Sequence, residues 1–284
     1  MYIITKLAMT EYKKLPWGTK TFIMGIINAT PDSFSGDGTA FDIEASIRKV
    51  NEFVEYGVDI LDIGGESSRP KGIYDSVTPV DVDQELTRVI PVIEAIRSMS
   101  DIPISIDTWK SEVAKEAIAS GASIVNDIWG LKKDTNMASV VAQNRVGLIL
   151  THNGTSINYN DVVDETILEI ENMIVLALDE GIDKDCIIID PGFGFGKNPE
   201  QNLQILGKLE KYKKFDLPVL IGTSRKSTIG YVLDLPVEDR IEGTAATIAI
   251  SITKKVDIVR VHDVKEMGRV VKMSDAIVRG WSGV

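Results

Sequence analysis

The segment from Cys186 to Lys197 combines a short apolar run with groups that could do chemistry. Its first four residues are too few for a helix and too uniformly apolar for a solvated strand, which predicts a strand covered on both faces. The run ends at Asp190, and three glycines then alternate with two phenylalanines before Lys197. Such a loop can bring its backbone close to a flat or charged ligand. Glycines alone indicate a turn as readily as a site, but the flanking acid and lysine favour a site.

Polar residues close every one of eight short apolar runs in the chain. They are Asn28; the segment Gly64–Pro70; Asp107; Asn126 and Asp127; Thr151, His152 and Asn153; Asp190; the segment Gly222–Ser227; and Arg260 with His262 and Asp263. A single Asp or Asn after a strand is usually a helix cap, and a lone histidine is more often a loop residue than a catalyst. Capping alone explains the whole set poorly, because Asn, Asp and Lys recur where Ser or Thr would serve equally well.

One group of these side chains could recognise a flat heterocycle. Asp107, Asn126 and Asp190 supply carboxylates and an amide that can hydrogen-bond the amino and ring N–H edge of such a ring. Lys226 could donate to a ring carbonyl, and residues 224–227 precede a helical segment whose N-terminus favours an anion. The spacing around Lys226 is not that of a Walker A phosphate loop.

A second group could bind a diphosphate and a hydrated Mg²⁺. Asn28 offers a neutral oxygen ligand of the kind that Mg²⁺ accepts. Ser68, Arg69, Arg260 and His262 offer hydrogen-bond donors for phosphate oxygens. The chain has two histidines and one cysteine, and no cluster of them indicates zinc.

Strand-like and helix-like segments alternate along the chain. The strand-like runs are Phe22–Ile27, Ile60–Ile63, Ile102–Ile106, Ser123–Val125, Gly147–Leu150, Ile187–Ile189, Val219–Ile221 and Ile258–Val261. This alternation predicts an α/β fold with a parallel sheet, and eight repeats fit a closed (β/α)8 TIM barrel, whose strand ends meet at one mouth. We therefore predict a single barrel over residues 21–284, with residues 1–20 as an N-terminal extension that covers its bottom.

Three apolar stripes at helical spacing predict which helix faces pack on the barrel. They consist of Ile43, Ile47, Val50 and Val54; of Val113, Ala117 and Ile118; and of Ile167, Ile170, Ile174 and Leu178. Gly121 is the predicted C-cap of the second of these helices. Pro91 is expected to kink or divide the helix predicted over residues 81–99.

Composition limits the class of protein. The 284 residues include 42 acidic and 31 basic ones, a formal net charge of −11, which argues against a nucleic-acid partner. No apolar stretch is long enough to span a membrane, and the N-terminus acquires charge too early for a secretory signal. The single cysteine can form neither an intrachain disulfide nor a thiolate metal site. We expect a cytoplasmic enzyme that acts on small molecules.

Seven segments resemble, in order, successive motifs of the dihydropteroate synthase family. They read M-G-I-I-N-A-T-P-D-S-F-S, D-I-G-G-E-S-S-R-P, I-S-I-D-T, I-V-N-D-I, D-P-G-F-G-F-G-K, G-T-S-R-K-S and R-V-H-D-V. The resemblance covers nearly the whole barrel. It implies condensation of 6-hydroxymethyl-7,8-dihydropterin diphosphate with p-aminobenzoate to give 7,8-dihydropteroate and pyrophosphate in folate biosynthesis. It also implies that C–O cleavage precedes attack by the arylamine.

The resemblance implies a role for individual residues. Pterin contacts would come from Asp107, Asn126, Asp190, Lys226 and Phe195, diphosphate contacts from Asn28, Ser68, Arg69, Arg260 and His262, and p-aminobenzoate contacts from Phe34, Pro70 and Ser227. Catalytic roles would fall to Lys226, Arg260, His262 and Arg69, with Mg²⁺ held partly by Asn28. Residues 241–252 are apolar on more than one face, and the side turned away from the barrel is the expected contact of a homodimer, as in the family.

Two positions depart from the family pattern. Ser68 stands where Thr is common, and Gly36-Asp37-Gly38 replaces the commoner Asp-Gly-Gly, so the role of Asp37 stays open. Other functions also stay open. A methyltetrahydrofolate methyltransferase is disfavoured by Arg69, Lys226 and the R-V-H segment, and an inactive pterin-binding subunit is disfavoured because no motif residue is lost. A sugar-phosphate isomerase shares the expected fold, and a fold alone does not decide function.

Overall fold

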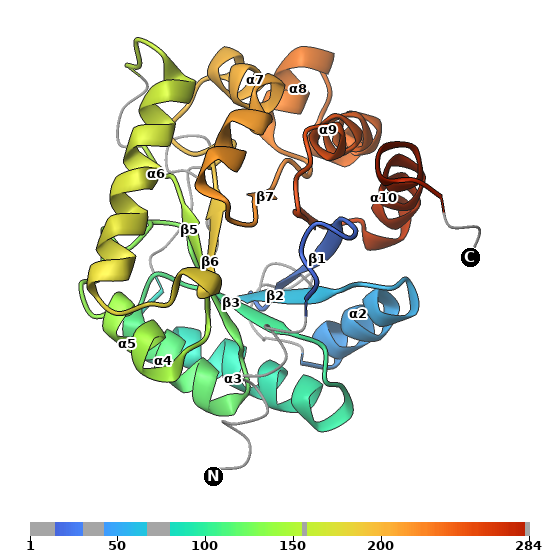
Figure 1. The fold of residues 1–284 in the computed structure, drawn as a ribbon. Helices are drawn as coiled ribbons and strands as arrows, with labels where there is room; N and C mark the ends of the chain where they lie inside the picture. The colour runs from blue at the N-terminus through green and yellow to red at the C-terminus, as the bar shows by residue number, and fades with distance from the viewer. Residues whose placement is uncertain (1–14, 31–42, 67–79, 155–157, 282–284) are drawn as a thin grey trace.

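The computed structural model describes residues 15–30, 43–66, 80–154 and 158–281 (Figure 1). Its strands are β1 (Phe22–Asn28), β2 (Ile60–Gly64), β3 (Ile104–Asp107), β4 (Ile124–Asp127), β5 (Gly147–Thr151), β6 (Ile187–Asp190), β7 (Leu220–Ile221) and β8 (Ile258–Val261). Its α-helices are α2 (Ile43–Glu55), α3 (Val82–Met99), α4 (Ser111–Ser120), α5 (Met137–Asn144), α6 (Val162–Asp179), α7 (Pro199–Gly207), α8 (Ser227–Leu233), α9 (Ile241–Thr253) and α10 (Val264–Arg279). Short 3₁₀ helices are η3 (Lys184–Cys186), η4 (Leu209–Phe215) and η5 (Val237–Asp239). Within these ranges, no helix has both the length and the apolar character needed to cross a membrane.

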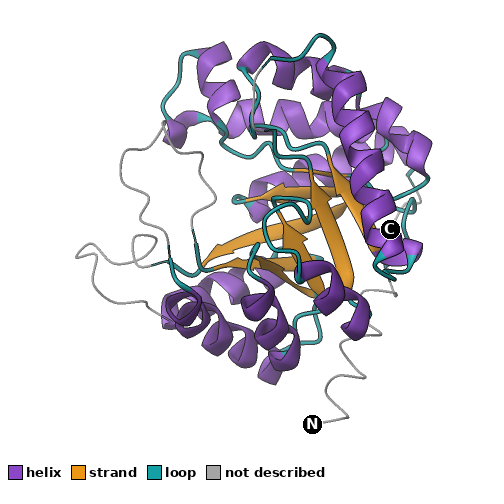
Figure 2. Ribbon diagram, turned by 90° about the vertical axis from the view of Figure 1, so that its left-hand side faces the viewer, coloured by secondary structure: helices purple, strands orange, loops and turns teal. Residues whose placement is uncertain are grey.

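The strands form one parallel barrel. Their order is β6-β5-β4-β3-β2-β1-β8-β7, and a parallel bridge between Ile189 and Val219 joins β6 to β7 and so closes the ring. The helices surround the strands on the outside (Figures 1 and 2). The predicted (β/α)8 barrel is therefore confirmed. Because all strands run in one direction, their carboxyl ends lie at the same mouth.

Two apolar cores hold this barrel together: one lies between the strands and the helices, and the other lies inside the ring of strands. The inner core consists of Phe22, Met24, Ile60, Ile124, Ile149, Ile188, Leu220 and Ile258. Leu15 and Trp17 pack against it, and the Trp17 ring lies edge-on to Phe22 at a centroid distance of 5.2 Å. Both residues belong to the predicted N-terminal extension, whose first 14 residues lie outside the described part. Most of the inner core comes from the early positions of the strands, which leaves the later positions for polar groups.

Two helix faces differ from the predicted stripes. In α2, Ile43 and Val54 are 38% and 42% exposed, while Phe53 is buried. The buried face of α2 is rotated because the Phe53 ring packs against Gly25 of β1. A β-carbon at position 25 would lie only 2.6 Å from that ring. In α6, Leu178 is 42% exposed, so this end of the predicted stripe faces outward.

Helix and strand ends also test the prediction. Gly121 ends α4 with φ of 122°, so the predicted C-cap is confirmed. Helix α3 runs through Pro91 without a break, so the helix is not divided there. Strand β3 begins at Ile104 rather than at Ile102, after Pro103, which has no N–H to give to the sheet.

Candidate active site

Buried polar side chains gather at the carboxyl ends of the strands. Asp107 ends β3 beside Asn126 of β4, and Asp190 ends β6. Arg260 lies within β8, and Lys226 is the N-cap of α8, directly after the β7 loop. Asp107, Asn126 and Asp190 are 7%, 3% and 6% exposed, so the mouth places charge in a nearly dry environment.

The centre of this mouth is a shared ion pair. Arg260 donates from Nε to Asp62 Oδ2 at 2.6 Å and from Nη2 to Asp107 Oδ2 at 2.7 Å. The Asn126 amide donates to the same Asp62 carboxylate at 3.3 and 3.5 Å. Asp62 is fully buried in the middle of β2 and was not among the predicted site residues. Its neighbours Leu61 and Ile63 belong to the core between strands and helices, so the alternation of side chains along a strand turns Asp62 into the barrel.

Burial changes the charge state of the carboxyl groups here. Burial raises the pKa of Asp107 to about 7, although the positive charge of Arg260 opposes the rise. The negative charge of Asp62 adds to it. Burial likewise raises the pKa of Asp190, against the lowering effect of Lys226. Near neutral pH, Asp107 therefore exists in both forms, so it can accept or donate a hydrogen bond to a ligand.

Lys226 is held by the glycine-rich loop after β6. Its ammonium donates to the backbone carbonyl of Phe193 and lies 4.4 Å from the centre of the Phe195 ring. A β-carbon on Gly194, whose φ is 86°, would lie 2.8 Å from the Lys226 stem. Burial lowers the pKa of Lys226 to about 8, while the charge of Asp190 raises it. In the structure Gly194 permits the close approach of Lys226 to this loop. The predicted approach of the loop to a ligand stays a prediction.

The ends of β7 and β8 place two further predicted residues together. His262 Nδ1 lies 3.0 Å from the Ser224 hydroxyl, and the His262 backbone N–H donates to the same oxygen at 3.2 Å. Burial lowers the pKa of His262 to about 3, and the charge of Arg260 adds to this effect. His262 is therefore neutral at physiological pH and offers a hydrogen bond rather than a charge. Arg225 forms a two-point ion pair with Asp263, at 2.9 and 2.5 Å.

The other predicted residues fall into two sets. Asn28 ends β1 and Ser227 begins α8, and both are partly exposed at the mouth. Phe34, Ser68, Arg69 and Pro70 lie outside the described residues, as does Asp37. Within the described ranges, no three His, Cys, Asp or Glu side chains converge as a metal site. Among the described residues, Asn28 offers the neutral oxygen ligand for Mg²⁺ that the family resemblance implies.

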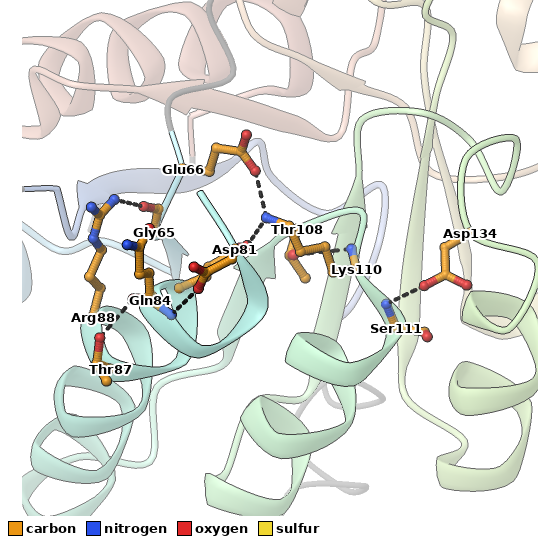
Figure 3. A network of polar contacts seen from close by, with 11 residues as sticks. Gly65, Glu66, Asp81, Gln84, Thr87, Arg88, Thr108, Lys110, Ser111 and Asp134 are labelled. Atoms are coloured by element: carbon orange, nitrogen blue, oxygen red, sulfur yellow. Dashed lines mark hydrogen bonds and ion pairs between the residues drawn. The ribbon is translucent and has the colours of Figure 1, made fainter. Parts of the chain in front are cut away.

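A second buried ion pair lies beside the end of β2 (Figure 3). Lys110 donates to Glu66 Oε2 at 2.6 Å and to Glu85 of α3, whose side chain is 1% exposed. Arg88 donates to the Gly65 carbonyl at 2.7 Å. Together these bonds fix the last described residues before residue 67. The sequence prediction missed Lys110 and Glu85, because neither lies at a strand end.

An eight-stranded parallel barrel with a charged mouth at the carboxyl strand ends defines an α/β-barrel enzyme. The pterin binding enzyme family matches residues 24–262. The dihydropteroate synthase of Clostridium beijerinckii is 48% identical, over 94% of this chain and 98% of its own, and that of Bacillus subtilis is 46% identical, over 96% and 94%. The structure of the Clostridium difficile dihydropteroate synthase in the presence of pteroic acid has a TM-score of 0.88 and 46% identity, over 93% of this chain and 99% of that one. The chain belongs to the pterin binding enzymes and, within them, to the dihydropteroate synthase family.

The first prediction concerns Asp62. Replacing it in an Asp62→Asn variant is expected to lower the free energy of unfolding by about 2 kcal/mol, because Arg260 loses a charged hydrogen-bond acceptor. The pKa of Asp107 should fall as well, since the charge of Asp62 helps to raise it. Urea unfolding measures the first effect, with Asp216→Asn at an exposed position as the control. Equal stability of the two variants would contradict a structural role for Asp62.

The second prediction concerns Lys226. A Lys226→Ala variant should fold, because this residue belongs to a loop rather than to either core, but it should lose roughly 10²- to 10³-fold in kcat/KM, as when one positioned donor is removed from an active site. The exposed Lys115→Ala is the matched control. Near-normal turnover of Lys226→Ala, or a loss explained by unfolding in circular dichroism, would show that Lys226 is not part of the site.

Proposed function

We propose that the mouth of this barrel performs the reaction of a dihydropteroate synthase, a transferase of folate biosynthesis. The reaction joins 6-hydroxymethyl-7,8-dihydropterin diphosphate to p-aminobenzoate and releases pyrophosphate. The observation that supports this assignment most is the group of the buried Asp107, Asn126 and Asp190 with the partly buried Lys226 and Arg260, which has the donors and acceptors that a pterin edge requires. Solved relatives include the Xanthomonas albilineans dihydropteroate synthase in complex with 7,8-dihydropteroate, with a TM-score of 0.83 and 37% identity over 91% of this chain and 94% of that one.

The pterin is proposed to bind with its amino and ring N–H edge toward the carboxyl groups. Asp107 and Asp190 accept these hydrogen bonds, and the Asn126 carbonyl oxygen stays available because its amide nitrogen is turned toward Asp62. Lys226 donates to the ring carbonyl. Phe195 lies next to the Lys226 ammonium and can pack against the same ring.

The C–O bond of the substrate breaks first, and its electron pair leaves with the pyrophosphate. Positive charge then spreads into the pterin, where the buried carboxylates of Asp62, Asp107 and Asp190 stabilise it electrostatically. The amine nitrogen of p-aminobenzoate forms the new C–N bond and afterwards loses a proton to solvent. Because the electrophile is already cationic, the weakly basic arylamine needs no strong general base.

Arg260, Arg69 and His262 are proposed to receive the leaving diphosphate, with Ser68 at the same subsite. The Arg260 guanidinium side chain is 18% exposed, so it can reach a phosphate while it keeps its bonds to Asp62 and Asp107. His262 is neutral and contributes an N–H donor. Ser227, at the first position of α8, is proposed to receive the p-aminobenzoate together with Phe34 and Pro70.

Mg²⁺ is proposed to bind through Asn28, water and the diphosphate. When bound, it would neutralise charge on the leaving group. Asn28 is the one neutral oxygen ligand that the family resemblance gives, and a hydrated Mg²⁺ commonly takes few protein ligands.

The third prediction is the reaction itself. With Mg²⁺, purified protein should convert the pterin diphosphate and p-aminobenzoate into dihydropteroate and pyrophosphate in equal amounts. Omission of either substrate should abolish dihydropteroate formation, and excess chelator should strongly lower the rate, because Asn28 alone cannot retain the ion. Liquid chromatography with mass detection measures both products. Methyl transfer from methyltetrahydrofolate without dihydropteroate formation would contradict the assignment, and full turnover in chelator would contradict the metal.

The protein is further proposed to act in the cytoplasm. Its single cysteine, Cys186, is a buried free thiol at the end of η3, as expected for a protein kept in a reducing compartment. The proposed substrates are small anions rather than nucleic acid.

The outer surface of α9 and α10 supports a homodimer. Ile248 and Ile252 of α9 face the barrel, whereas Ile250 is 47% exposed. On the neighbouring α10, Met273 and Ile277 are 63% and 72% exposed. Exposed apolar side chains on two neighbouring helices fit a contact with a second copy of the chain.

The fourth prediction is the mass in solution. Light scattering at micromolar concentration should give the mass of a dimer for the native protein and of a monomer for Ile277→Glu, which puts a charge into the proposed contact. Leu168→Glu on α6, where Leu168 is 59% exposed, is the matched control and should stay dimeric. A monomeric native protein would refute the proposed dimer.

A further inference from the structure

A cluster of ionisable side chains joins the glycine-rich loop to the end of β5. It consists of Lys197, His152, Glu169 and Lys132. His152 is fully buried and Lys197 is 9% exposed, whereas the Glu169 side chain is 40% exposed. None of these four residues contributes to the reaction described above, yet two of them are polar groups placed deep in the protein at a cost in solvation.

Lys197 is surrounded by acceptors from two loops. Its Nζ lies 3.0 Å from the Gly192 carbonyl and 2.9 Å from the Phe195 carbonyl, both in the loop after β6. It also lies 2.9 Å from His152 Nδ1 and 3.4 Å from the His152 carbonyl, at the end of β5. An ammonium group has three protons to donate. One side chain therefore ties the loop after β6 to the loop after β5.

The position of Lys197 assigns the tautomer of His152. While Lys197 is protonated it can only donate, so below the Lys197 pKa of about 7 His152 Nδ1 accepts and the ring proton lies on Nε2. Nε2 lies 3.3 Å from Glu169 Oε2, in a contact not aligned as a hydrogen bond, and Glu169 also pairs with Lys132 at 2.6 Å. Burial lowers the pKa of His152 to about 3, and the charge of Lys197 lowers it further, so the ring stays neutral. Burial lowers the pKa of Lys197 itself to about 7. The negative charge of Asp190 raises this pKa, and the positive charge of Lys226 lowers it.

The loop that Lys197 holds has no room to shift toward β5. A β-carbon on Gly192, whose φ is 72°, would lie 1.8 Å from the His152 carbonyl oxygen. The same loop gives the Gly192 N–H to Asp190 Oδ1 at 2.7 Å, and its Phe193 carbonyl accepts the hydrogen bond from Lys226. The loop thus sets where Asp190 and Lys226 stand relative to each other.

We propose that Lys197 is a positioning residue for pterin binding, which fixes the loop after β6 against His152 so that Asp190 and Lys226 face the ligand together. This inference rests on the proposed pterin site. It predicts a specific pattern: the affinity for the pterin depends on Lys197, whereas the p-aminobenzoate subsite at Ser227, on another element, does not.

The test compares native protein with Lys197→Met, which keeps an apolar stem of similar length and removes the donors. Calorimetric titration with 6-hydroxymethylpterin should show a Kd raised about tenfold or more, the worth of one charge-assisted hydrogen bond. The KM for p-aminobenzoate should stay within about twofold. The exposed Lys208→Met is the matched control and should bind the pterin as native protein does.

Nitrogen-15 NMR of the histidines gives a readout that a general loss of stability would not produce. The chain has only two histidines, and His262→Gln assigns their signals. At a pH below the Lys197 pKa of about 7, native His152 should show a proton on Nε2 and an acceptor Nδ1, and folded Lys197→Met should lose the acceptor shift at Nδ1. A proton on Nδ1 in native protein would overturn the inference, even if Lys197→Met failed to fold. Equal pterin Kd values for native protein and Lys197→Met would overturn the role of Lys197 but leave the proposed function standing. Native protein that binds no pterin would overturn both the role of Lys197 and the proposed function.

Discussion

The structure depends on a guanidinium placed among carboxylates in the interior of the barrel. Arg260 of β8 pairs with Met24 of β1. Met24 belongs to the apolar core inside the ring of strands, so charged and apolar side chains lie next to each other in the barrel interior. An isolated charge at that depth would be prohibitively costly, and two carboxylates around one arginine leave an excess negative charge. The raised pKa of Asp107 relieves this excess, because the group can take up a proton near neutral pH.

Three buried or half-buried lysines fix the loops that surround this charge. Lys110 holds the end of β2, Lys197 joins the loops after β5 and β6, and Lys226 bonds to the loop after β6. Each of these side chains bonds to a group on another loop or helix. This arrangement orients the donors and acceptors before the substrate binds, so little of the binding free energy is used to order them. The strands place the charged groups of the site in the barrel interior, and these lysines fix the loop ends around them.

The sequence predicted the barrel and most of the mouth because both follow local patterns. Apolar runs mark strands, and the direction of a parallel barrel brings their polar ends to one place, which is where Asp107, Asn126 and Asp190 lie. Asp62 was not predicted because it lies in the middle of an apolar strand rather than at its end. Its role follows from the hydrogen bond with Arg260, a residue distant in the sequence. The predicted α2 face was wrong at Ile43 and Val54, while Ile47 and Val50 do pack on the core. Phe53 was missed because its fit to Gly25 depends on another element. Roles that depend on Phe34, Arg69 and Pro70 rest on the family resemblance, since these residues lie outside the described ranges.

The central claim is that the buried carboxyl groups and Arg260 form a preorganised pterin pocket. A crystal structure of the protein with bound 7,8-dihydropterin tests it most directly. The account predicts ring N–H groups within hydrogen-bond distance of Asp107 and Asp190, the ring carbonyl within reach of Lys226, and an unchanged Arg260–Asp62 contact. A pterin bound away from these residues, or bound only after Arg260 has separated from Asp62, would contradict it.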